Sequence, residues 1–564
     1  MLALAGLLGS SGLTASASAH ASKSRIRYAT VRRACSTPAP GLAHCLALAL
    51  VPAKPGAAGA RAYVEGAGSY STGPAGGLTP ADLASAYSFS PSAGGSGQTV
   101  AIVDAFDDPK IEADLGTFDA NYGLAACTTA NGCFTKVNQS GLASPLPEPD
   151  SGWGGEISLD VETVHSVCPS CKILLVEASA PDSADLAKSV NTAVALGATE
   201  VSNSYAFEEV GMSKSVQKAY DHAGVVITAS SGDQGYLDWD WLFEGLPFPK
   251  APNAPASLPT VVAVGGTSLT LKPSGAREDE TVWNDSGPPS EPSAFKQYNA
   301  TGSGCSTVFT APEWQQNAPG WSNAACGTKR LTNDVAAVAD PYTGIDIYDS
   351  YKEPGWITIG GTSLSSPLTS ALYALAGGAH GVSYPARTLY EHLGQSSLFD
   401  VTQGGDGYCD AESNAPCGEP AINKKKGPID CEGTTACDAA VGFDGPSGVG
   451  APTGLGAFEP AFTGSQPTVL TGKATSVSAS TAVLNATVNP NGGEVTTCTF
   501  EYGPAKVLGK KASCSKLPGS GTGAVSVSVE ITGLSPSTKY AFRITAKNAA
   551  GASTGKEKTL KTKA

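Results

Sequence analysis

Short apolar runs alternate with helical patterns along the middle of the chain. The apolar, β-branched runs are Thr99–Phe106, Lys172–Ala178, Glu200–Tyr205, Val225–Gly232 and Thr260–Leu269. Apolar residues at helical spacing mark the segments between them: Glu156–Val167, Ser183–Leu196 and Ser215–Ala223. Near-continuous apolar strands separated by helices are typical of a parallel sheet covered by helices on both faces. The pattern predicts an α/β domain whose ligands bind beyond the carboxyl ends of the strands.

The two ends of the chain differ from this middle part. From residue 465 onward Ser, Thr and Val alternate with a period of two, which predicts a separate all-β sandwich over residues 465–564. Residues 23–77 are rich in Ala, Gly and Pro and weakly periodic, and we interpret them as a pro-segment or linker. Ordered structure is expected to start at Leu78–Tyr87, a helix with Thr79 as N-cap and Pro80 at its first position. The main domain then spans residues 78–464.

Charge narrows the choice of partner. The 564 residues carry a net charge of −14 and contain no apolar run long enough to span a bilayer. From Thr471 onward there are 12 basic and 4 acidic residues, so this part carries +8 and the preceding 470 residues carry −22. An acidic body repels polyphosphates, which argues against nucleic acid as a partner. The basic end is either a solvated face or a contact for an anionic surface or polymer.

A leader and the cysteines indicate the compartment. Residues 1–22 begin with an apolar run and end in small residues, which resembles a secretory signal without the usual basic start. Fourteen cysteines predict local disulfides in a secreted, extracellular protein, although spacing alone does not fix their pairing. The close neighbours are Cys35/Cys45, Cys127/Cys133, Cys168/Cys171, Cys305/Cys326, Cys409/Cys417, Cys431/Cys437 and Cys498/Cys514. A metal at Cys168 and Cys171 is the weaker interpretation, because no second ligand pair has matching spacing.

Three local motifs carry candidate chemistry. Glu156 and Asp160 are four residues apart and share one helix face, a spacing also common on solvated helices. Asp233 follows an apolar strand in a glycine-rich turn, where backbone can approach a substrate. Ser363 lies in GGTSLSSP at the start of a helical run, where backbone N–H groups surround it. Such a serine is either a nucleophile or a helix N-cap.

A serine nucleophile needs a base, and the six histidines offer no obvious one. His165 shares the helix of Glu156, but its VHSVC context differs from that of a subtilisin histidine. We therefore interpret each histidine as structural.

The order Glu-x-x-x-Asp, then SxGDxG, then GGTSxxxP resembles the sedolisin family of serine-carboxyl peptidases. The segments at 255–269 and 333–348 resemble further parts of that family, so the likeness covers roughly 78–458. It implies a subtilisin-like fold and an endopeptidase that acts on proteins or peptides. By position, the resemblance makes Ser363 the nucleophile, Glu156 its general base, Asp160 the acid that orients Glu156, and Asp233 an oxyanion-hole donor. The C-terminal stretch TGLSPSTKYAFRITAKNAAG similarly resembles a fibronectin type III module.

These roles imply activity in acid. Asp233 can donate a hydrogen bond to an oxyanion only while its carboxyl group is protonated. At a reference pKa of about 4 it is ionised at neutral pH and would repel the oxyanion. Glu156 and Asp160 are expected to titrate as a pair, with a rate optimum at roughly pH 3–5.

The resemblance also implies one structural Ca²⁺ ion. Its ligands would be the carboxylates of Asp400 and Asp444 and the carbonyl oxygens of Val401, Ala440 and Gly442. Oxygen-rich loops of this kind suit calcium.

Two alternatives remain open at this stage. One is a neutral Ser/His/Asp hydrolase of subtilisin type that uses Asp104 with His165. The other is a non-catalytic secreted protein in which the β module binds a partner. The chain is expected to act as a monomer in either case.

Overall fold

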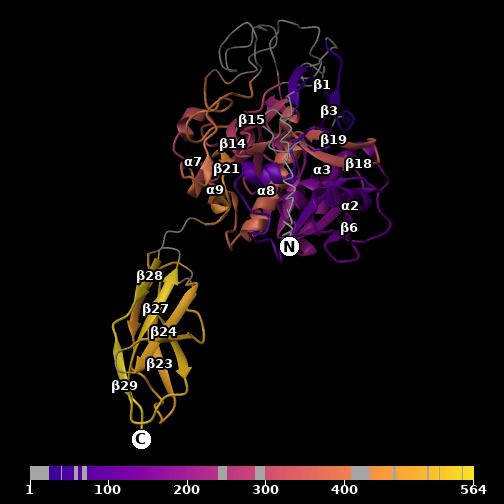
Figure 1. Ribbon diagram of the computed structural model, residues 1–564. Helices are drawn as coiled ribbons and strands as arrows, with labels where there is room; N and C mark the ends of the chain where they lie inside the picture. Colours follow the sequence, from indigo (N-terminus) through magenta and orange to yellow (C-terminus); the bar gives the residue numbers. More distant parts are fainter. Residues whose placement is uncertain are drawn as a thin grey trace, which may run out of the picture. The chain divides into compact units, whose positions relative to one another are not determined.

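The computed structural model divides the chain into two compact units, Met1–Glu459 and Pro460–Ala564, which are described separately (Figure 1). The leader, residues 1–22, lies outside the described residues, as do Cys409 and Cys417. The structure describes residues 25–39, 41–55, 61–65, 73–238, 250–285, 299–407, 431, 433–460, 465–493, 495–504, 507–519, 521–548 and 551–564.

A mainly parallel sheet forms the centre of the first unit, in the order β14-β13-β10-β8-β5-β7-β6, with β17 also paired to β13. All its neighbours are parallel except β14, which pairs antiparallel with β13 at one edge. The predicted parallel core is confirmed, but the whole sheet is mixed. Its strands are β5 (Thr99–Ala105), β6 (Phe134–Asn138), β7 (Lys172–Ala178), β8 (Glu200–Asn203), β10 (Val226–Ser230), β13 (Val262–Leu271), β14 (Arg277–Val282) and β17 (Val335–Val338).

Two buried helices at the centre of this unit hold Glu156, Asp160 and Ser363. Helix α3 (Ser151–Val167) packs against α8 (Thr362–Ala376), and both are labelled in Figure 1. Helix α8 also packs on strands β8, β10 and β13 of the sheet. Nearly every residue of both helices is buried. The other helices include α1 (Pro80–Ala86), α2 (Ile111–Tyr122), α4 (Ser183–Ala195), α5 (Lys214–Ala219), α7 (Glu313–Gln316) and α9 (Ala386–Glu391). Thr79 caps α1 as predicted, in a reciprocal capping box with Asp82.

Ordered structure begins well before Leu78, so the predicted start was wrong. The antiparallel sheet β18-β19-β3-β1-β4 joins three N-terminal strands to a hairpin from residues 345–360, and Figure 1 shows β1 and β3 beside β19. Strands β1, β3 and β4 pair with one another, but β3 joins β19 across about 310 positions, a contact for which the sequence carries no local signal. The strands are β1 (Arg25–Arg33), β3 (Leu48–Pro52), β4 (Arg61–Glu65), β18 (Ile345–Asp349) and β19 (Gly355–Gly360).

Two further contacts bind the N-terminal strands to the rest of the unit. Strand β2 (His44–Cys45) pairs antiparallel with β9 (Tyr205–Glu208). Val31, Leu48, Trp283 and Ala339 form a small apolar cluster in which Trp283 is fully buried. The strands therefore belong to the same packed body as the α/β sheet.

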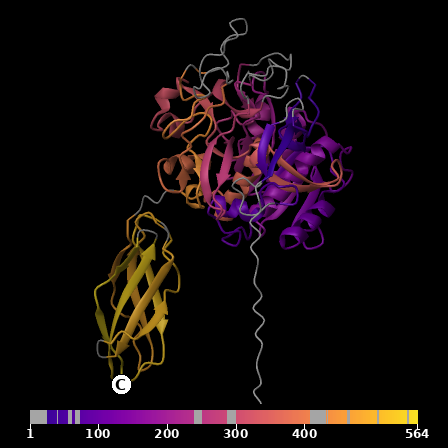
Figure 2. The ribbon, with the colours of Figure 1, turned by 45° about the horizontal axis from the view of Figure 1, so that its top comes forward.

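The second unit is rich in β-strands and contains two antiparallel sheets (Figure 2). One has the order β22-β23-β26, and the other has β25-β24-β27-β28 with β29 on β27. Leu484 of β23, Val527 of β26, Phe500 of β24 and Phe542 of β27 share one apolar cluster. Its likeness to a fibronectin type III module stays a prediction. The strands are β22 (Thr468–Thr471), β23 (Ala482–Asn489), β24 (Thr497–Pro504), β25 (Lys510–Ser513), β26 (Val525–Ile531), β27 (Lys539–Asn548), β28 (Gly551–Thr554) and β29 (Lys558–Lys561).

Six disulfides form in the described part of the chain, each between the close neighbours noted from the sequence. Cys168 and Cys171 are bonded to each other, which removes the metal interpretation of that motif. Among the described residues, no helix is both long and apolar enough to cross a lipid bilayer.

Candidate active site

Helix α3 places Glu156 and Asp160 one turn apart inside the protein. Asp150 is the N-cap of this helix, and its side chain accepts hydrogen bonds from the N–H groups of Gly152 and Trp153. Both acids are fully buried, whereas a solvated pair at this spacing would face water. Burial is the main cause that raises the pKa of each carboxyl well above its ordinary value. Glu156 and Asp160 are therefore not a solvent-exposed acid pair, which is the other arrangement that their spacing allows.

Asp104, at the end of β5, is a third buried acid in the same place. Its charge raises the pKa of both Glu156 and Asp160, and burial raises its own pKa to about 8. Neither of its carboxylate oxygens has a hydrogen-bond partner in the described part of the chain. The negative charges of these carboxyls oppose one another, so ionisation of one disfavours ionisation of the others. The sequence analysis considered Asp104 only as the acid of the alternative subtilisin-type hydrolase, in which it would act with His165.

Ser363 occupies the first turn of α8. Gly361 precedes the helix with a φ of 98°, a left-handed conformation that glycine adopts without strain. Ser363 Oγ lies 3.5 Å from the carbonyl oxygen of Ser204, and its hydroxyl lowers the pKa of Glu156 by favouring the ionised form. The hydroxyl is thus adjacent to a carboxylate that can take its proton.

Asp233 is held beside the same helix end by Thr362. Its Oδ1 accepts hydrogen bonds of 2.8 Å from both the N–H and the Oγ1 hydroxyl of Thr362. Its Oδ2 is buried and has no hydrogen-bond partner among the described residues. Burial raises the pKa of Asp233 to about 7, because ionisation would place a charge away from water. Oδ1 is therefore fixed by Thr362, and Oδ2 is the oxygen that is available for a proton.

Ser204 connects the acids to the serine, and the sequence analysis missed it. It lies between β8 and β9, and its Oγ donates a 2.9 Å hydrogen bond to Asp160 Oδ1. Its carbonyl oxygen is the one that faces Ser363 Oγ. Ser204 lies near the carboxyl end of the predicted strand Glu200–Tyr205, and this position was the available signal.

A segment from the N-terminal strands also reaches the site. The backbone N–H groups of Leu46 and Ala47 donate hydrogen bonds of 2.9 and 2.8 Å to Glu156 Oε2. These bonds stabilise the ionised glutamate against the effect of burial. The predicted pro-segment thus contacts the predicted general base directly.

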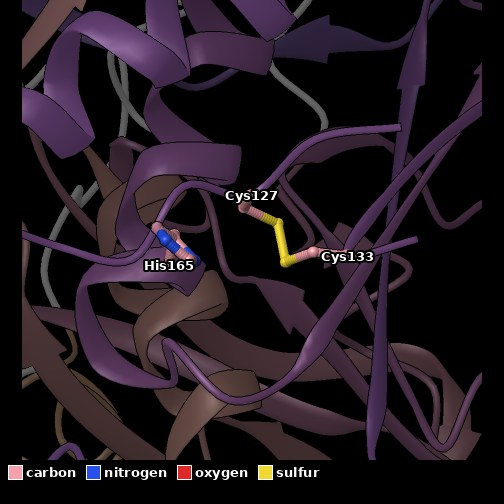
Figure 3. Close-up of side chains that lie close together, drawn as sticks. All are labelled: Cys127, Cys133 and His165. Atoms are coloured by element: carbon pink, nitrogen blue, oxygen red, sulfur yellow. A yellow bond between two sulfur atoms is a disulfide. The ribbon is translucent and has the colours of Figure 1, made fainter. Parts of the chain in front are cut away.

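His165 belongs to a different environment. It lies nine residues after Glu156 on the helix, about 180° around it at about 100° per residue. Its Nε2 lies 2.9 Å from the carbonyl oxygen of Ala125 and 3.2 Å from Asp119 Oδ1. Figure 3 shows the ring beside Cys127 and Cys133, whose sulfurs are joined in a disulfide and so do not offer thiolates to a metal. This placement gives no support to a histidine base for Ser363.

The five residues of the predicted calcium site lie in two loops that contact each other. The carboxylate of Asp400 accepts hydrogen bonds of 3.1 Å from the N–H of Gly442. Asp444 is buried and accepts from the N–H of Ala440 at 3.0 Å, while Val401 is also buried. The Asp400 charge is one of the causes that raise the pKa of Asp444. Two neighbouring carboxylates and adjacent backbone carbonyls are a donor set that fits Ca²⁺.

Comparisons with known proteins agree with this arrangement. Residues 137–413 match the subtilase family. Kumamolisin from Bacillus sp. (strain MN-32) is 32% identical over 343 residues, which are 58% of this chain and 57% of the relative. Sedolisin from Pseudomonas sp. (strain 101) is 28% identical over 365 residues, which are 61% of this chain and 59% of the relative. The chain thus spans less than three fifths of either relative.

A solved structure extends the likeness to the fold. Pseudomonas sedolisin, described as a serine-carboxyl proteinase complexed with two molecules of pseudo-iodotyrostatin, superposes with a TM-score of 0.53 at 26% identity. The likeness covers 68% of this chain and 96% of that structure. The fold, the buried serine and the subtilase match support a serine-type peptidase. Within that class, the two relatives and the solved structure support the sedolisin family and its subtilisin-like fold.

Proposed function

We propose that the chain is a secreted acid serine-carboxyl peptidase that cleaves proteins or peptides through an acyl-enzyme on Ser363. One observation carries the proposal. A buried serine at a helix N-terminus lies among buried carboxyls, and Ser363 is near enough to Glu156 to lower the pKa of that carboxyl.

The chemistry follows from the positions of these groups. Ser363 Oγ attacks the substrate carbonyl carbon while its proton passes to Glu156. Asp160, held by Ser204, orients Glu156 and shares the proton. The protonated Oδ2 of Asp233 donates a hydrogen bond to the developing oxyanion, because its Oδ1 is fixed by Thr362. Glu156 then protonates the leaving amine, and water releases the acyl group.

The same geometry makes the activity dependent on acid. Asp233 must keep its proton, and its pKa of about 7 extends the protonated range above that of an ordinary aspartate. Glu156 must be able to ionise, which its hydrogen bonds from backbone N–H groups favour. The decline in rate toward alkaline pH is expected near pH 7, higher than the reference pKa of aspartate implies.

We also propose that Asp400, Asp444 and the carbonyls of Val401, Ala440 and Gly442 hold one structural Ca²⁺ ion. The ion would neutralise two acids that repel each other and fix the two loops together. It has no role in bond cleavage.

The six described disulfides support secretion into an oxidising compartment. The β-rich unit would be a fibronectin type III-like module that binds a surface or polymer, attached to a peptidase that acts as a monomer.

Casein degradation by the purified full chain, followed from pH 2 to 9, tests the proposed activity. We expect a maximum below pH 7 for the wild type, and no degradation at any pH for Ser363→Ala or Glu156→Gln. Degradation by a folded Ser363→Ala protein would overturn the proposal. A maximum above pH 7 would contradict the role of protonated Asp233.

A further inference from the structure

One sheet of the second unit has cations on its outer side. Three residues of strand β27 belong to the apolar cluster of this unit: Tyr540, Phe542 and Ile544. Because side chains alternate along a strand, Lys539, Arg543 and Lys547 point to the opposite side of the sheet. Lys539 and Lys547 are exposed, and the side chain of Arg543 is 41% exposed. The middle strand of this sheet therefore presents a cation to solvent at every fourth residue.

Neighbouring strands add two more cations to this side, since residues paired across strands share a face. Lys561 of β29 pairs with Lys539, and Glu501 of β24 pairs with both Arg543 and Lys511 of β25. We call the five cations the basic face: Lys511, Lys539, Arg543, Lys547 and Lys561. At the paired strand positions that the structure describes on this side, Glu501 is the one acid, and it forms ion pairs with Arg543 and Lys511. The face with Glu501 therefore carries 5 − 1, or +4.

Three lysines of the basic face lack an acidic partner. Lys539, Lys547 and Lys561 form no ion pair with any residue in the described ranges. Lys539 and Lys561 lie directly opposite each other, and like charges at such a position are unfavourable without a counter-ion. An anionic group laid across this pair would relieve the repulsion.

The shape and polarity of the basic face suit an extended hydrophilic chain. Its cations follow β27 from Lys539 to Lys547, a length of about 27 Å at about 3.4 Å per residue. The hydroxyl groups of Thr499 and Thr545 lie on the same side as these cations. Hydroxyls between spaced cations can bind sugar hydroxyls and separated anions together.

Two other anionic partners fit this face poorly. Single-stranded nucleic acid needs exposed aromatic rings on which its bases stack, but all four aromatic rings of this sheet belong to the apolar cluster. A lipid bilayer is bound by apolar side chains that insert into it. The large exposed apolar residues described in this unit lie outside the strands of this sheet: Leu470, Val507, Leu517 and Val525.

We propose that the basic face binds a linear polysaccharide that carries sulfate esters. The inference rests on the proposed function only in taking the β-rich unit as a module that binds a surface or polymer, and it names the chemistry of that polymer. Lysine and a sulfate ester both stay charged in acid, whereas a carboxylate with a pKa of about 4 is partly neutral there. Such a polymer is therefore held under the acid conditions in which the peptidase is proposed to work.

The test measures binding of the full wild-type chain at pH 4 to immobilised dextran sulfate, carboxymethyl dextran and uncharged dextran, by biolayer interferometry. We expect binding to dextran sulfate, weaker binding to carboxymethyl dextran and none to dextran. The affinity for dextran sulfate should fall steeply between about 50 and about 200 mM NaCl, because the contact releases counter-ions. Binding to dextran as tight as to dextran sulfate, or binding to vesicles of anionic lipid without binding to dextran sulfate, would overturn the inference.

Two triple variants with the same change in net charge isolate the basic face. One replaces Lys539, Lys547 and Lys561 by Gln, and the control replaces three exposed lysines at other places in the unit: Lys473, Lys516 and Lys556. The first should bind dextran sulfate roughly tenfold more weakly or worse, with a salt slope smaller by roughly one per lysine removed, and the control should bind nearly as the wild type does. Thermal unfolding checks that both variants are folded. Equal losses in the two variants would show that net charge alone, and not this face, holds the polymer.

Casein degradation by the same preparations separates this inference from the proposed peptidase. Both triple variants should degrade casein at the wild-type rate, since none of their lysines lies in the first unit. If the wild type degrades casein but does not bind dextran sulfate, this inference is wrong while the proposed peptidase stands. If it binds dextran sulfate through the basic face but does not degrade casein at any pH, the peptidase proposal fails and this inference stands.

Discussion

Replacement of Asp233 by asparagine separates the proposed role of this residue from a merely structural one. The amide of the new side chain can keep the hydrogen bonds from Thr362 through its oxygen, and it places a permanent N–H donor where Oδ2 now lies. A donor that does not titrate cannot be lost as pH rises. The alkaline decline of the rate should therefore disappear in Asp233→Asn, whereas Asp233→Ala loses the donor at every pH.

The magnitude follows from the pKa of about 7 for Asp233. Burial raises this pKa, so the required protonated form is present below it and is lost above it. About 99% of the carboxyl is protonated at pH 5 and about 9% at pH 8, so wild-type kcat/KM should fall about tenfold between these values. Removal of one oxyanion donor typically costs about 10²–10³ in rate, or about 3–4 kcal/mol, and this is the loss expected for Asp233→Ala.

The assay is kcat/KM on a fluorogenic peptide from pH 3 to 9, with folding checked by circular dichroism at each pH. Asp346→Asn is the matched control, because it removes another buried carboxyl, whose partners are the N–H groups of Ala75, Gly76 and Gly77 and the hydroxyl of Thr358. This control should retain the alkaline decline. An Asp233→Asn enzyme that is active and still declines near pH 7 would refute the role given to Asp233.

Three further outcomes are expected. Ser204→Ala should lower kcat by about tenfold with little change in KM, because Asp160 loses a hydrogen bond that helps orient the base; an unchanged kcat would remove Ser204 from the site. Chelation of Ca²⁺ by EGTA should lower the melting temperature of the wild type but not of Asp444→Asn, as calorimetry can measure; equal shifts would contradict the proposed ion. Arg330→Met should destabilise the protein by about 3–5 kcal/mol in urea unfolding, since it leaves Asp334 buried without its ion-pair partner. A loss below about 1 kcal/mol would show that other contacts, such as the Tyr390 hydroxyl bond to Asp334, suffice.

Much of the α/β sheet could be predicted because its signal is local. Lys172–Ala178 forms a strand with the bounds that the apolar run indicates, and Thr79 caps a helix where its motif places it. Glu156 and Ser363 were found from short motifs whose residues are neighbours in sequence. In each case the information lies within about ten residues.

The features that the sequence did not reveal depend on distant partners. Leu46 and Ala47 meet Glu156 across about 110 positions, and no composition rule for an Ala/Gly/Pro-rich stretch predicts that contact. In the sequence, Asp104 is one polar residue within a predicted strand. Only the fold shows that Glu156 and Asp160 of α3 lie near it. The pKa of about 7 for Asp233 likewise results from burial in the folded chain. The reference pKa of aspartate describes a solvated side chain and so does not include this effect.

The small cluster beneath the N-terminal strands has a practical consequence. Val31 and Leu48 cover Trp283, so a shortened chain that starts at Leu78 would expose an indole and leave the β19 backbone edge unpaired. Exposed edges and aromatic rings promote aggregation. Departure of the covering strands would also shift tryptophan emission to longer wavelength, so the protein carries an intrinsic fluorophore that reports when its amino-terminal portion leaves.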